Sequence, residues 1–410
     1  MSMKYTLEEI RKNINREELL KLTQDLIRIP SHTVYENREK EVAAYIADIL
    51  EREGIEYCFQ SADGDRCNVL ATIRGNGTGK SLMLNGHMDT VPVAGMDDPF
   101  NPVIVDGYMY GRGSSDMKSG LAAMLYAVLT VHRMKVPLDG DLVFAGVIDE
   151  EAAKSTGSRV IAEKGPITDY AIIGEPSSLY PIIAHKGIDY FQIDFHGKAA
   201  HSSRPETGAN AIYAAADFIS AVKAVLIPEF DNLSHPYLGK PTINVGLMCG
   251  SAEINKPFLL QQSETFAGVV PDEASVFIDV RWIPGQSIPQ IQSQLQALAD
   301  SILPKNPGIS AEVNYIPLPR PAMEISPEEA LPQAILESIS QVSPETAEFK
   351  GLSGFMDSGI LYGVAGILSM VFGPGDLSVA HGINEKVEVE QIIKAAQIYT
   401  KTALDICVNS

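Results

Sequence analysis

The sequence predicts an α/β fold in which a central mixed sheet, flanked by helices, is interrupted by an inserted domain of order βαββαβ. The first observation is a set of short, uncharged apolar runs, such as 142–147 and 170–173, that have the length of buried strands and alternate with helix-like stretches. The second is a change of texture after residue 186, where alternating apolar and polar residues over 190–195 predict a half-buried strand. A chain of 410 residues is long enough for two separate cores.

The residues up to Gly54 are expected to form three helices, two of which start at the capping patterns Thr6-x-x-Glu9 and Asn15-x-x-Glu18. The third is expected from Asn37 to Gly54, because glycine readily takes the left-handed conformation that ends a helix. Apolar runs then predict strands at 68–73, 81–85, 142–147 and 170–173, and a helix is expected at 119–133.

The middle of the chain is expected to fold as a domain of its own. After the strand at 190–195 come a helix from Ala209, strands at 242–247 and 274–282, a helix at 289–302 and a strand at 310–315. Helix and strand alternation then resumes, with a strand at 366–372 and a last helix from Glu388. We therefore predict a first domain made of residues 1–186 and 318–410, and an inserted domain at 187–317.

The charge balance excludes several classes of partner. With 52 acidic and 32 basic residues, the net charge of −20 argues against nucleic acids and anionic membrane surfaces, because both require clustered positive charge. No apolar run approaches the roughly 18 residues of a membrane span, and the start of the chain shows no signal-peptide core. The four cysteines form no Cys-x-x-Cys pair. We expect a cytoplasmic protein with reduced thiols.

A His-x-Asp pattern, His87-Met88-Asp89, closes one of the predicted strands. On an extended chain, residues two apart share a face, so His87 can bind a metal ion while Asp89 accepts the proton on its other ring nitrogen. By itself this pattern is more often a surface turn. Its position at the end of an apolar strand, where the sites of α/β proteins gather, favours a functional site.

Three further acidic positions follow at comparable strand ends or helix starts. Asp116 lies in a glycine-bearing loop before a helix, the run Asp149-Glu150-Glu151 follows a strand, and Glu175 follows the next strand. Taken singly, these positions fit a helix cap, a solvated loop and a turn. Adjacent carboxylates, however, repel one another unless a cation lies between them. Four such positions in one α/β unit favour a shared metal site.

His381, which also follows a predicted strand, supplies a second imidazole. Two histidines with three or four carboxylates make a mixed nitrogen and oxygen ligand set, which favours zinc, with cobalt or manganese as alternatives. The set is too large for a single ion, so we expect two divalent metal ions.

The glycine-rich segment 75–81 looks like a phosphate-binding loop. Arg74 stands where the first glycine of such a loop is required, and a strand follows in place of the helix that would hold a phosphate. We interpret the segment as a hairpin turn.

In this order, the motifs closely resemble the two-zinc metallopeptidase family that includes acetylornithine deacetylase, succinyl-diaminopimelate desuccinylase, aminoacylase and glutamate carboxypeptidase. The resemblance spans about residues 15–400. It implies one ion bound by His87 and Glu175, a second bound by Glu151 and His381, and Asp116 as the bridge between them. It also implies that Glu150 is the general base and that Asp89 is the hydrogen-bonding partner of His87.

The inserted domain resembles the lid and dimerisation domain of that family, which implies a homodimer. Its segment 197–205 looks like the loop whose histidine, here His201, binds the substrate carbonyl oxygen. Asp279-Val280-Arg281 matches the place where an arginine, here Arg281, holds the substrate α-carboxylate. Without the resemblance, His201 would be read as a helix-capping loop residue and Arg281 as an exposed strand residue.

The resemblance implies hydrolysis of the amide bond of a small N-acyl amino acid with a free carboxylate. A dipeptidase or carboxypeptidase is the alternative, and a catalytically dead metal-binding protein is a remote one, against which the retention of Glu150 argues. Two departures concern the substrate region: Gly268 stands where the family commonly has asparagine, and 251–266 looks like an insertion. Asp357, in a segment only loosely similar to the family's glycine-rich element, stays unassigned.

Overall fold

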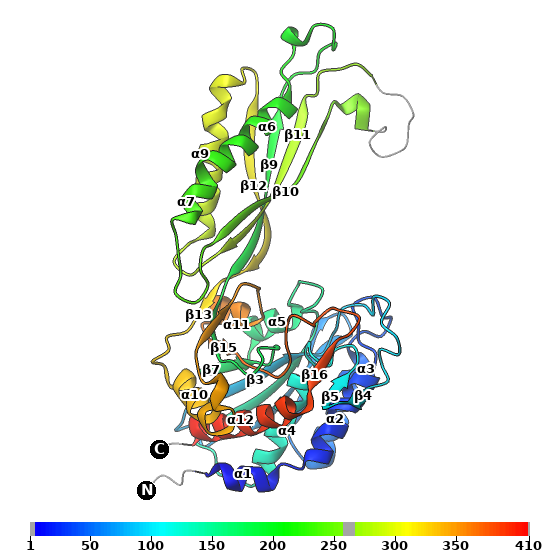
Figure 1. The fold of residues 1–410 in the computed structure, drawn as a ribbon, viewed down its shortest axis with the longest axis vertical. Coiled ribbons are helices and arrows are strands. Elements are labelled where there is room, and N and C mark those ends of the chain that lie inside the picture. The colour runs from blue at the N-terminus through cyan, green and yellow to red at the C-terminus, as the bar shows by residue number, and fades with distance from the viewer. Residues whose placement is uncertain (1–4, 257–266, 409–410) are drawn as a thin grey trace. The chain divides into compact units, whose positions relative to one another are not determined.

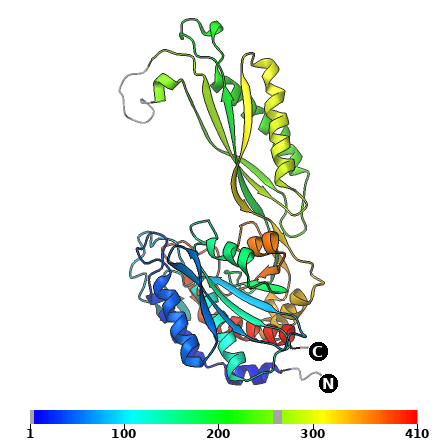
Figure 2. The same ribbon diagram turned by 180° about the vertical axis from the view of Figure 1, so that it is seen from behind.

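The computed structural model describes residues 5–256 and 267–408 (Figures 1 and 2). The chain divides into two compact units. The first comprises the residues up to His185, Met323–Leu352 and the residues from Met356 onward. The second comprises Lys186–Ala322 with Ser353–Phe355.

A mixed sheet forms the centre of the first unit, with strand order β1-β2-β6-β3-β7-β15-β8-β13 and β14 paired to β8. Strands β6, β3, β7 and β15 run parallel to their neighbours in this order, so their carboxyl ends meet at one edge. The strands are β1 (Tyr57–Asp63), β2 (Arg66–Ile73), β3 (Leu82–His87), β6 (Leu142–Val147), β7 (Tyr170–Ile173), β8 (Ile182–His185), β13 (Met323–Glu324), β14 (Lys350–Leu352) and β15 (Leu368–Val371).

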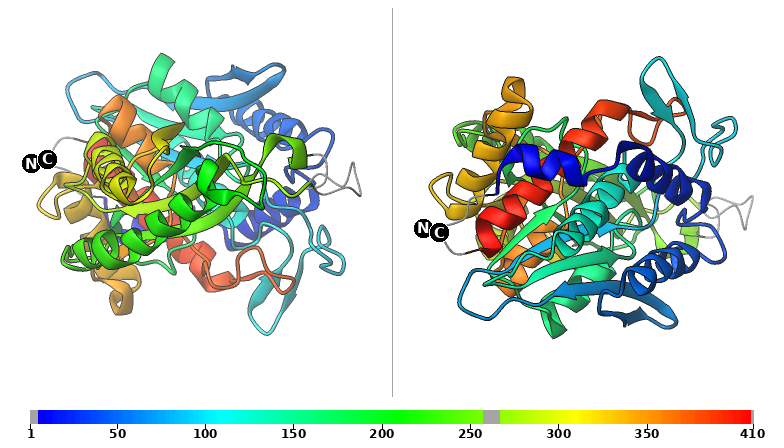
Figure 3. Two further views of the ribbon diagram at one scale, coloured as in Figure 1. Left: turned by 90° about the horizontal axis from the view of Figure 1, so that it is seen from above. Right: turned by 90° about the horizontal axis from the view of Figure 1, so that it is seen from below.

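Helices cover both faces of this sheet, which explains why its central strands are apolar throughout. On β3, Gly86 faces Leu121 of α4, while the next side chain back, Asn85, reaches Ser158 of α5 on the opposite face. Helix α12 packs against α4 (Figure 3). The helices of this unit are α1 (Leu7–Asn13), α2 (Arg16–Arg28), α3 (Lys40–Glu53), α4 (Lys118–Arg133), α5 (Thr156–Lys164), α10 (Ala330–Val342), α11 (Ser358–Ala365) and α12 (Val389–Cys407).

The predicted helix starts are largely confirmed. Thr6 and Glu9 form the reciprocal capping box, whereas the Asn15 side chain caps α2 without a return bond from a glutamate. Helix α3 begins at Lys40, three residues later than predicted, and ends as predicted at Gly54, whose φ is 70°.

The prediction of a hairpin turn at residues 75–81 is wrong. Strands β2 and β3 are not neighbours, because β6 lies between them and pairs with both. The main-chain N–H groups of Gly77, Thr78 and Gly79 all donate to the carbonyl oxygen of Asp139. These donors are therefore already used, which agrees with the exclusion of a phosphate loop.

The second unit has the predicted βαββαβ order: β9 (Gly187–His196), α6 (Ala211–Ala221), β10 (Thr242–Ser251), β11 (Glu273–Trp282), α9 (Ile288–Ile302) and β12 (Ser310–Arg320), with α7 (Ile227–Asp231) after α6. Its sheet has the order β10-β11-β9-β12. Alternate residues of β11 are buried, and the core joins Phe191, Phe195 and Phe218 with residues of α9. One face of the sheet is therefore covered by helices and the other is open.

Two features of the second unit bear on the sequence predictions. Most of the predicted insertion at 251–266 lies outside the described residues. Within the described part of the chain, one helical stretch, Ala211–Asp231, is long and apolar enough to cross a membrane, which is weak evidence because core helices pass the same test.

Candidate metal centre

The predicted ligands and the predicted general base, Glu150, come together at the carboxyl edge of the central sheet of the first unit. His87 is the last residue of β3, Glu150 and Glu151 follow β6, and Glu175 follows β7. His381 lies in the loop between β15 and β16 (Lys386–Glu388), a strand of a small sheet with β5 (Tyr108–Tyr110) and β4 (Val103–Val105). The loop ahead of α4 carries Asp116. Parallel strands thus deliver side chains that are distant in the sequence to one place.

Asp116 lies between the two histidines. Its Oδ1 is 3.0 Å from Nε2 of His87, and its Oδ2 is 3.3 Å from Nε2 of His381. The same nitrogen of His381 is 3.1 Å from Oε2 of Glu151. One carboxylate whose two oxygens face two different imidazoles has the arrangement required of a bridging ligand.

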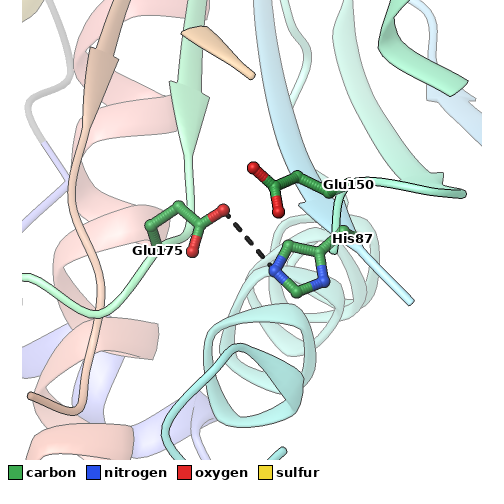
Figure 4. Close-up of side chains that lie close together, drawn as sticks. All are labelled: His87, Glu150 and Glu175. Atoms are coloured by element: carbon green, nitrogen blue, oxygen red, sulfur yellow. Dashed lines mark ion pairs between the residues drawn. The ribbon is translucent and has the colours of Figure 1, made fainter. Parts of the chain in front are cut away.

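Glu150 and Glu175 complete the surroundings of His87 (Figure 4). Oε1 of Glu175 lies 3.5 Å from Nε2 of His87. Two groups of three side chains each offer ligand atoms within 4.8 Å of one another, namely His87 with Glu150 and Glu175, and His87 with Asp116 and Glu151. The six side chains form what we call the ligand cluster: His87, Asp116, Glu150, Glu151, Glu175 and His381.

The electrostatics of the ligand cluster reflect an excess of buried negative charge. Burial and the charge of Glu175 raise the pKa of Glu150 well above its usual value, and burial with the charge of Asp116 raises the pKa of Glu175 to about 8. Hydrogen bonds to Asp116 and Glu151 raise the pKa of His381 to about 10. Burial opposes the ionisation of Asp116, but hydrogen bonds from His381 and His87 hold its pKa below the usual range.

The residues present fit a pair of divalent ions. Oε1 of Glu151 and Oε1 of Glu175 are buried and make no hydrogen bond among the described residues. Buried carboxylate oxygens without a hydrogen-bond donor are costly unless a cation compensates them. Two imidazoles and the three carboxylates of Asp116, Glu151 and Glu175 form the mixed nitrogen and oxygen donor set that suits zinc, cobalt or manganese.

The predicted hydrogen bond between His87 and the Asp89 carboxylate is replaced by a different contact. Nδ1 of His87 lies 2.9 Å from the main-chain oxygen of Asp89 and 3.8 Å from its carboxylate. The carboxylate instead accepts hydrogen bonds from the main-chain N–H groups of Glu150 and Glu151, at 3.2 and 2.9 Å. Asp89 thus orients the ring through its backbone and holds the turn after β6 with its side chain.

His201 and Arg281 belong to the second unit. Nδ1 of His201 accepts hydrogen bonds from the N–H of Ser203 at 3.1 Å and from its hydroxyl at 2.8 Å. The guanidinium of Arg281 pairs with both carboxylate oxygens of Asp279, at 2.9 and 3.0 Å, and the Arg281 side chain is 35% exposed. Both residues of this pair lie on the open face of β11, since the alternate positions are buried.

Three buried residues beside the ligand cluster, Asp357, Arg112 and Glu385, have no role predicted from the sequence. Asp357 accepts a hydrogen bond from the Ser158 hydroxyl at 2.6 Å, and its negative charge contributes to raising the pKa of Glu150, after burial and the charge of Glu175. Arg112 and Glu385 form an ion pair that is buried behind Asp116. A single sequence carries no signal for these contacts, because each joins segments more than a hundred positions apart.

Comparisons with known proteins point to one enzyme family. The profile of Peptidase family M20/M25/M40 matches residues 83–405 of the chain. Acetylornithine deacetylase from Myxococcus xanthus is 28% identical over 356 residues, which cover 85% of this chain and 86% of the relative. N-formyl-4-amino-5-aminomethyl-2-methylpyrimidine deformylase from Bacillus subtilis is 27% identical over 421 residues, covering 96% of this chain and 95% of the relative.

Solved structures confirm the predicted fold class. The crystal structure of aminopeptidase PepT from Bacillus cereus matches with a TM-score of 0.76 and 20% identity, and the match covers 96% of this chain and 99% of that one. At this identity the likeness shows the fold alone.

Proposed function

Because this chain belongs to peptidase family M20/M25/M40, we propose that it removes the acyl group from a small N-acyl amino acid by metal-dependent amide hydrolysis. The observation that carries the proposal is the ligand cluster, in which the carboxylate of Glu150 accepts no hydrogen bond from any described residue and lies beside His87 and Glu175. Both relatives described above carry the names of enzymes that remove acyl groups.

The ligand cluster would hold two divalent ions, one at His87 and Glu175 and the other at Glu151 and His381, with Asp116 shared. When bound, such ions would supply a water whose pKa is lowered to about 7 and would polarise the amide carbonyl. Among the described residues, nothing donates a hydrogen bond to the Glu150 carboxylate, which leaves it free to accept a proton from that water and return it to the departing nitrogen.

The hydrogen bonds of His201 support its assignment to the substrate carbonyl. A main-chain N–H can only donate, so Nδ1 of His201 must accept from Ser203, and the neutral ring carries its proton on Nε2. That N–H is then available to donate to a carbonyl oxygen as negative charge develops on it. Gly268, which stands where the family commonly has asparagine, lies next to the loop that carries His201. A Cβ atom at position 268 would lie 2.7 Å from the Ser202 hydroxyl of that loop.

Arg281 is the proposed anchor for the substrate carboxylate. Since its Nε and Nη2 already bind Asp279, a substrate carboxylate would meet the remaining nitrogen or displace this partner. The net charge of −20 gives an anionic substrate no general attraction, so recognition depends on this local cation.

We also propose that the protein is a homodimer formed through the second unit. Strand β10 lies at the edge of its sheet with its outer side unpaired by any described strand, and Leu247 on it is 54% exposed. Tyr213 on the neighbouring helix α6 is 69% exposed. Free strand edges and exposed apolar side chains are the features through which two copies of a chain associate.

A homodimer would allow His201 to serve the ligand cluster of the partner. Glu150→Ala and His201→Ala should each be nearly inactive, whereas random re-pairing of the two variants makes roughly half of the dimers mixed, each with one intact site. Activity should return to about a quarter of wild type. A confirmed re-pairing without recovery would show that His201 does not act in trans.

The reaction is tested with a panel of N-acetyl, N-succinyl and N-formyl amino acids, the N-formyl derivative of an aminomethylpyrimidine, and dipeptides. Each compound is assayed after removal of metals and after addition of zinc, cobalt or manganese. We expect metal-dependent release of an acyl group. A dipeptidase is the second candidate, and preferential cleavage of dipeptides would replace the deacylase proposal with it.

A further inference from the structure

The buried ion pair of Arg112 and Glu385 has no place in the chemistry described so far. We propose that Glu385 is a positioning residue which, together with Arg112, fixes the carboxylate of Asp116 relative to His381 and so sets the spacing of two bound metal ions. This inference rests on the proposed two-metal site and adds a residue that binds neither metal nor substrate.

Glu385 holds the loop that carries Asp116 from behind. Its Oε1 accepts hydrogen bonds from the main-chain N–H groups of Ser115 and Asp116, at 2.9 and 3.0 Å. Its other oxygen pairs with Nη1 of Arg112. The side chains of Arg112 and Glu385 are 0% and 1% exposed, so water does not compete for these contacts.

Two successive N–H groups bound to one oxygen fix the orientation of the peptide that precedes Asp116, and with it the direction of the Asp116 side chain. The loop cannot supply this constraint itself, since Glu385 is 269 positions away from Asp116 in the sequence. An amide at this position has one acceptor oxygen in place of two, so either the two buried N–H groups or the Arg112 guanidinium would be left without an acceptor, which is unfavourable and drives the loop to another conformation.

Further hydrogen bonds join the loop that carries Asp116 to the loop that carries His381. The N–H of Asp376 donates to the Ser115 hydroxyl at 3.0 Å, and that hydroxyl donates back to the Asp376 carbonyl oxygen at 3.0 Å. The N–H of Gly111 donates to the main-chain oxygen of Glu385 at 3.3 Å. The expected bridging ligand and a ligand of the second ion therefore lie on two loops that are joined at several points around Glu385.

A merely structural ion pair would behave differently. Its loss would lower the melting temperature and would weaken the binding of both metal ions to the same extent. The magnetic coupling between two bound ions would stay unchanged. A positioning role predicts a specific effect on the second ion and on the bridge. Residues that orient metal ligands from behind typically change metal affinity by about 10- to 100-fold.

The experiment compares wild type with Glu385→Gln, which keeps the size of the side chain and removes its charge. Asp169→Asn is the matched control, because Asp169 also accepts a main-chain N–H, from Ser81 at 2.9 Å, and pairs with a lysine at the other end of the sheet. Manganese binding is followed by calorimetry, and the exchange-coupled signal of the two-manganese form is followed by electron paramagnetic resonance.

For Glu385→Gln we expect about 10- to 100-fold weaker binding of the second ion and loss of the exchange-coupled signal, while the first ion still binds. Asp169→Asn should retain both ions and the coupled signal. Glu385→Asp, which keeps the charge but is shorter, should recover part of the coupling, and it carries the test if the glutamine variant fails to fold.

Two results would overturn the inference. One is a glutamine variant that binds two ions with wild-type affinity and shows the coupled signal. The other is equal weakening of both ions together with general thermal destabilisation. A wild-type protein that binds fewer than two ions would instead contradict the proposed function, so the two failures are distinguishable.

Discussion

The neighbouring glutamates Glu150 and Glu151 allow the sharpest test of the proposed chemistry. Glu150→Gln should remove turnover while leaving metal binding and stability close to wild type. The structure explains why: no described residue donates a hydrogen bond to the Glu150 carboxylate, so its conversion to an amide breaks no native contact. Glu151, in contrast, faces His381 at 3.1 Å and has one buried, unpaired oxygen. Glu151→Gln should therefore lose metal.

The size of the effect follows from the role assigned to Glu150. General acid–base catalysis is worth about 10²- to 10⁴-fold in rate, which corresponds to about 3 to 5 kcal/mol of activation free energy. A residue that both accepts and returns the proton should lie at the upper end of this range. The loss should appear in kcat rather than in KM, because Glu150 has no contact to offer the substrate before reaction.

The assay is steady-state hydrolysis of the best substrate of the panel, with metal content measured by elemental analysis on the same samples. Thermal denaturation of both variants provides the control for folding. If Glu150→Gln loses metal to the same extent as Glu151→Gln, Glu150 is a ligand and the assignment of the general base is wrong. A fall of less than about tenfold in kcat with metals retained would likewise contradict the assignment.

Three further outcomes are expected. Dialysis against a strong chelator should abolish hydrolysis and added divalent metal should restore it; full activity in metal-free protein would refute the two-metal site. Amidation of the substrate carboxylate should cost about 2 kcal/mol in kcat/KM, the lower end for a charge pair because Arg281 is 35% exposed, and Arg281→Met should abolish the difference between acid and amide substrates. Arg133→Gln should lower the melting temperature at pH 7, with a difference that shrinks as the pH falls below 4.5, because hydrogen bonds from Arg133 hold the pKa values of Glu18 and Glu53 below that value and the stability they contribute is lost on protonation. A pH-independent difference would show that Arg133 acts through packing on Tyr126, over whose ring it lies.

The sequence predicted the ligand cluster because its signals are local. All predicted ligands except His381, which lies in the loop between β15 and β16, stand close to a strand end or a helix start that apolar periodicity can locate, and parallel strands place such ends at one edge of a sheet. The helix stop at Gly54 and the cap at Thr6 are local in the same sense. The order of strands in a sheet, in contrast, depends on contacts between distant segments. The prediction of a hairpin turn at 75–81 is wrong for this reason, because β6, some 70 positions further along the chain, lies between β2 and β3.

For Asp149, the local sequence signal identifies the correct segment of the site but not the role of this residue. The run Asp149-Glu150-Glu151 indicated a cation, because three adjacent carboxylates repel one another. Two of them do face the ligand cluster, but Asp149 turns away and accepts hydrogen bonds from Arg66 at 3.0 Å and from the Thr156 hydroxyl at 2.7 Å.

The backbone explains how this division arises. Asp149 has a φ of 69°, a left-handed conformation that is uncommon outside glycine but that aspartate adopts more readily than most residues, and its contacts with Arg66 and Thr156 hold it there. The two residues that follow Asp149 lie in the ligand cluster, Glu150 near His87 and Glu151 near both His87 and His381. Asp149 therefore contributes to the site by fixing the backbone that precedes Glu150 and Glu151, and not by binding a metal ion. Glu385 acts in the same way on the loop that carries Asp116, through its hydrogen bonds to two main-chain N–H groups of that loop.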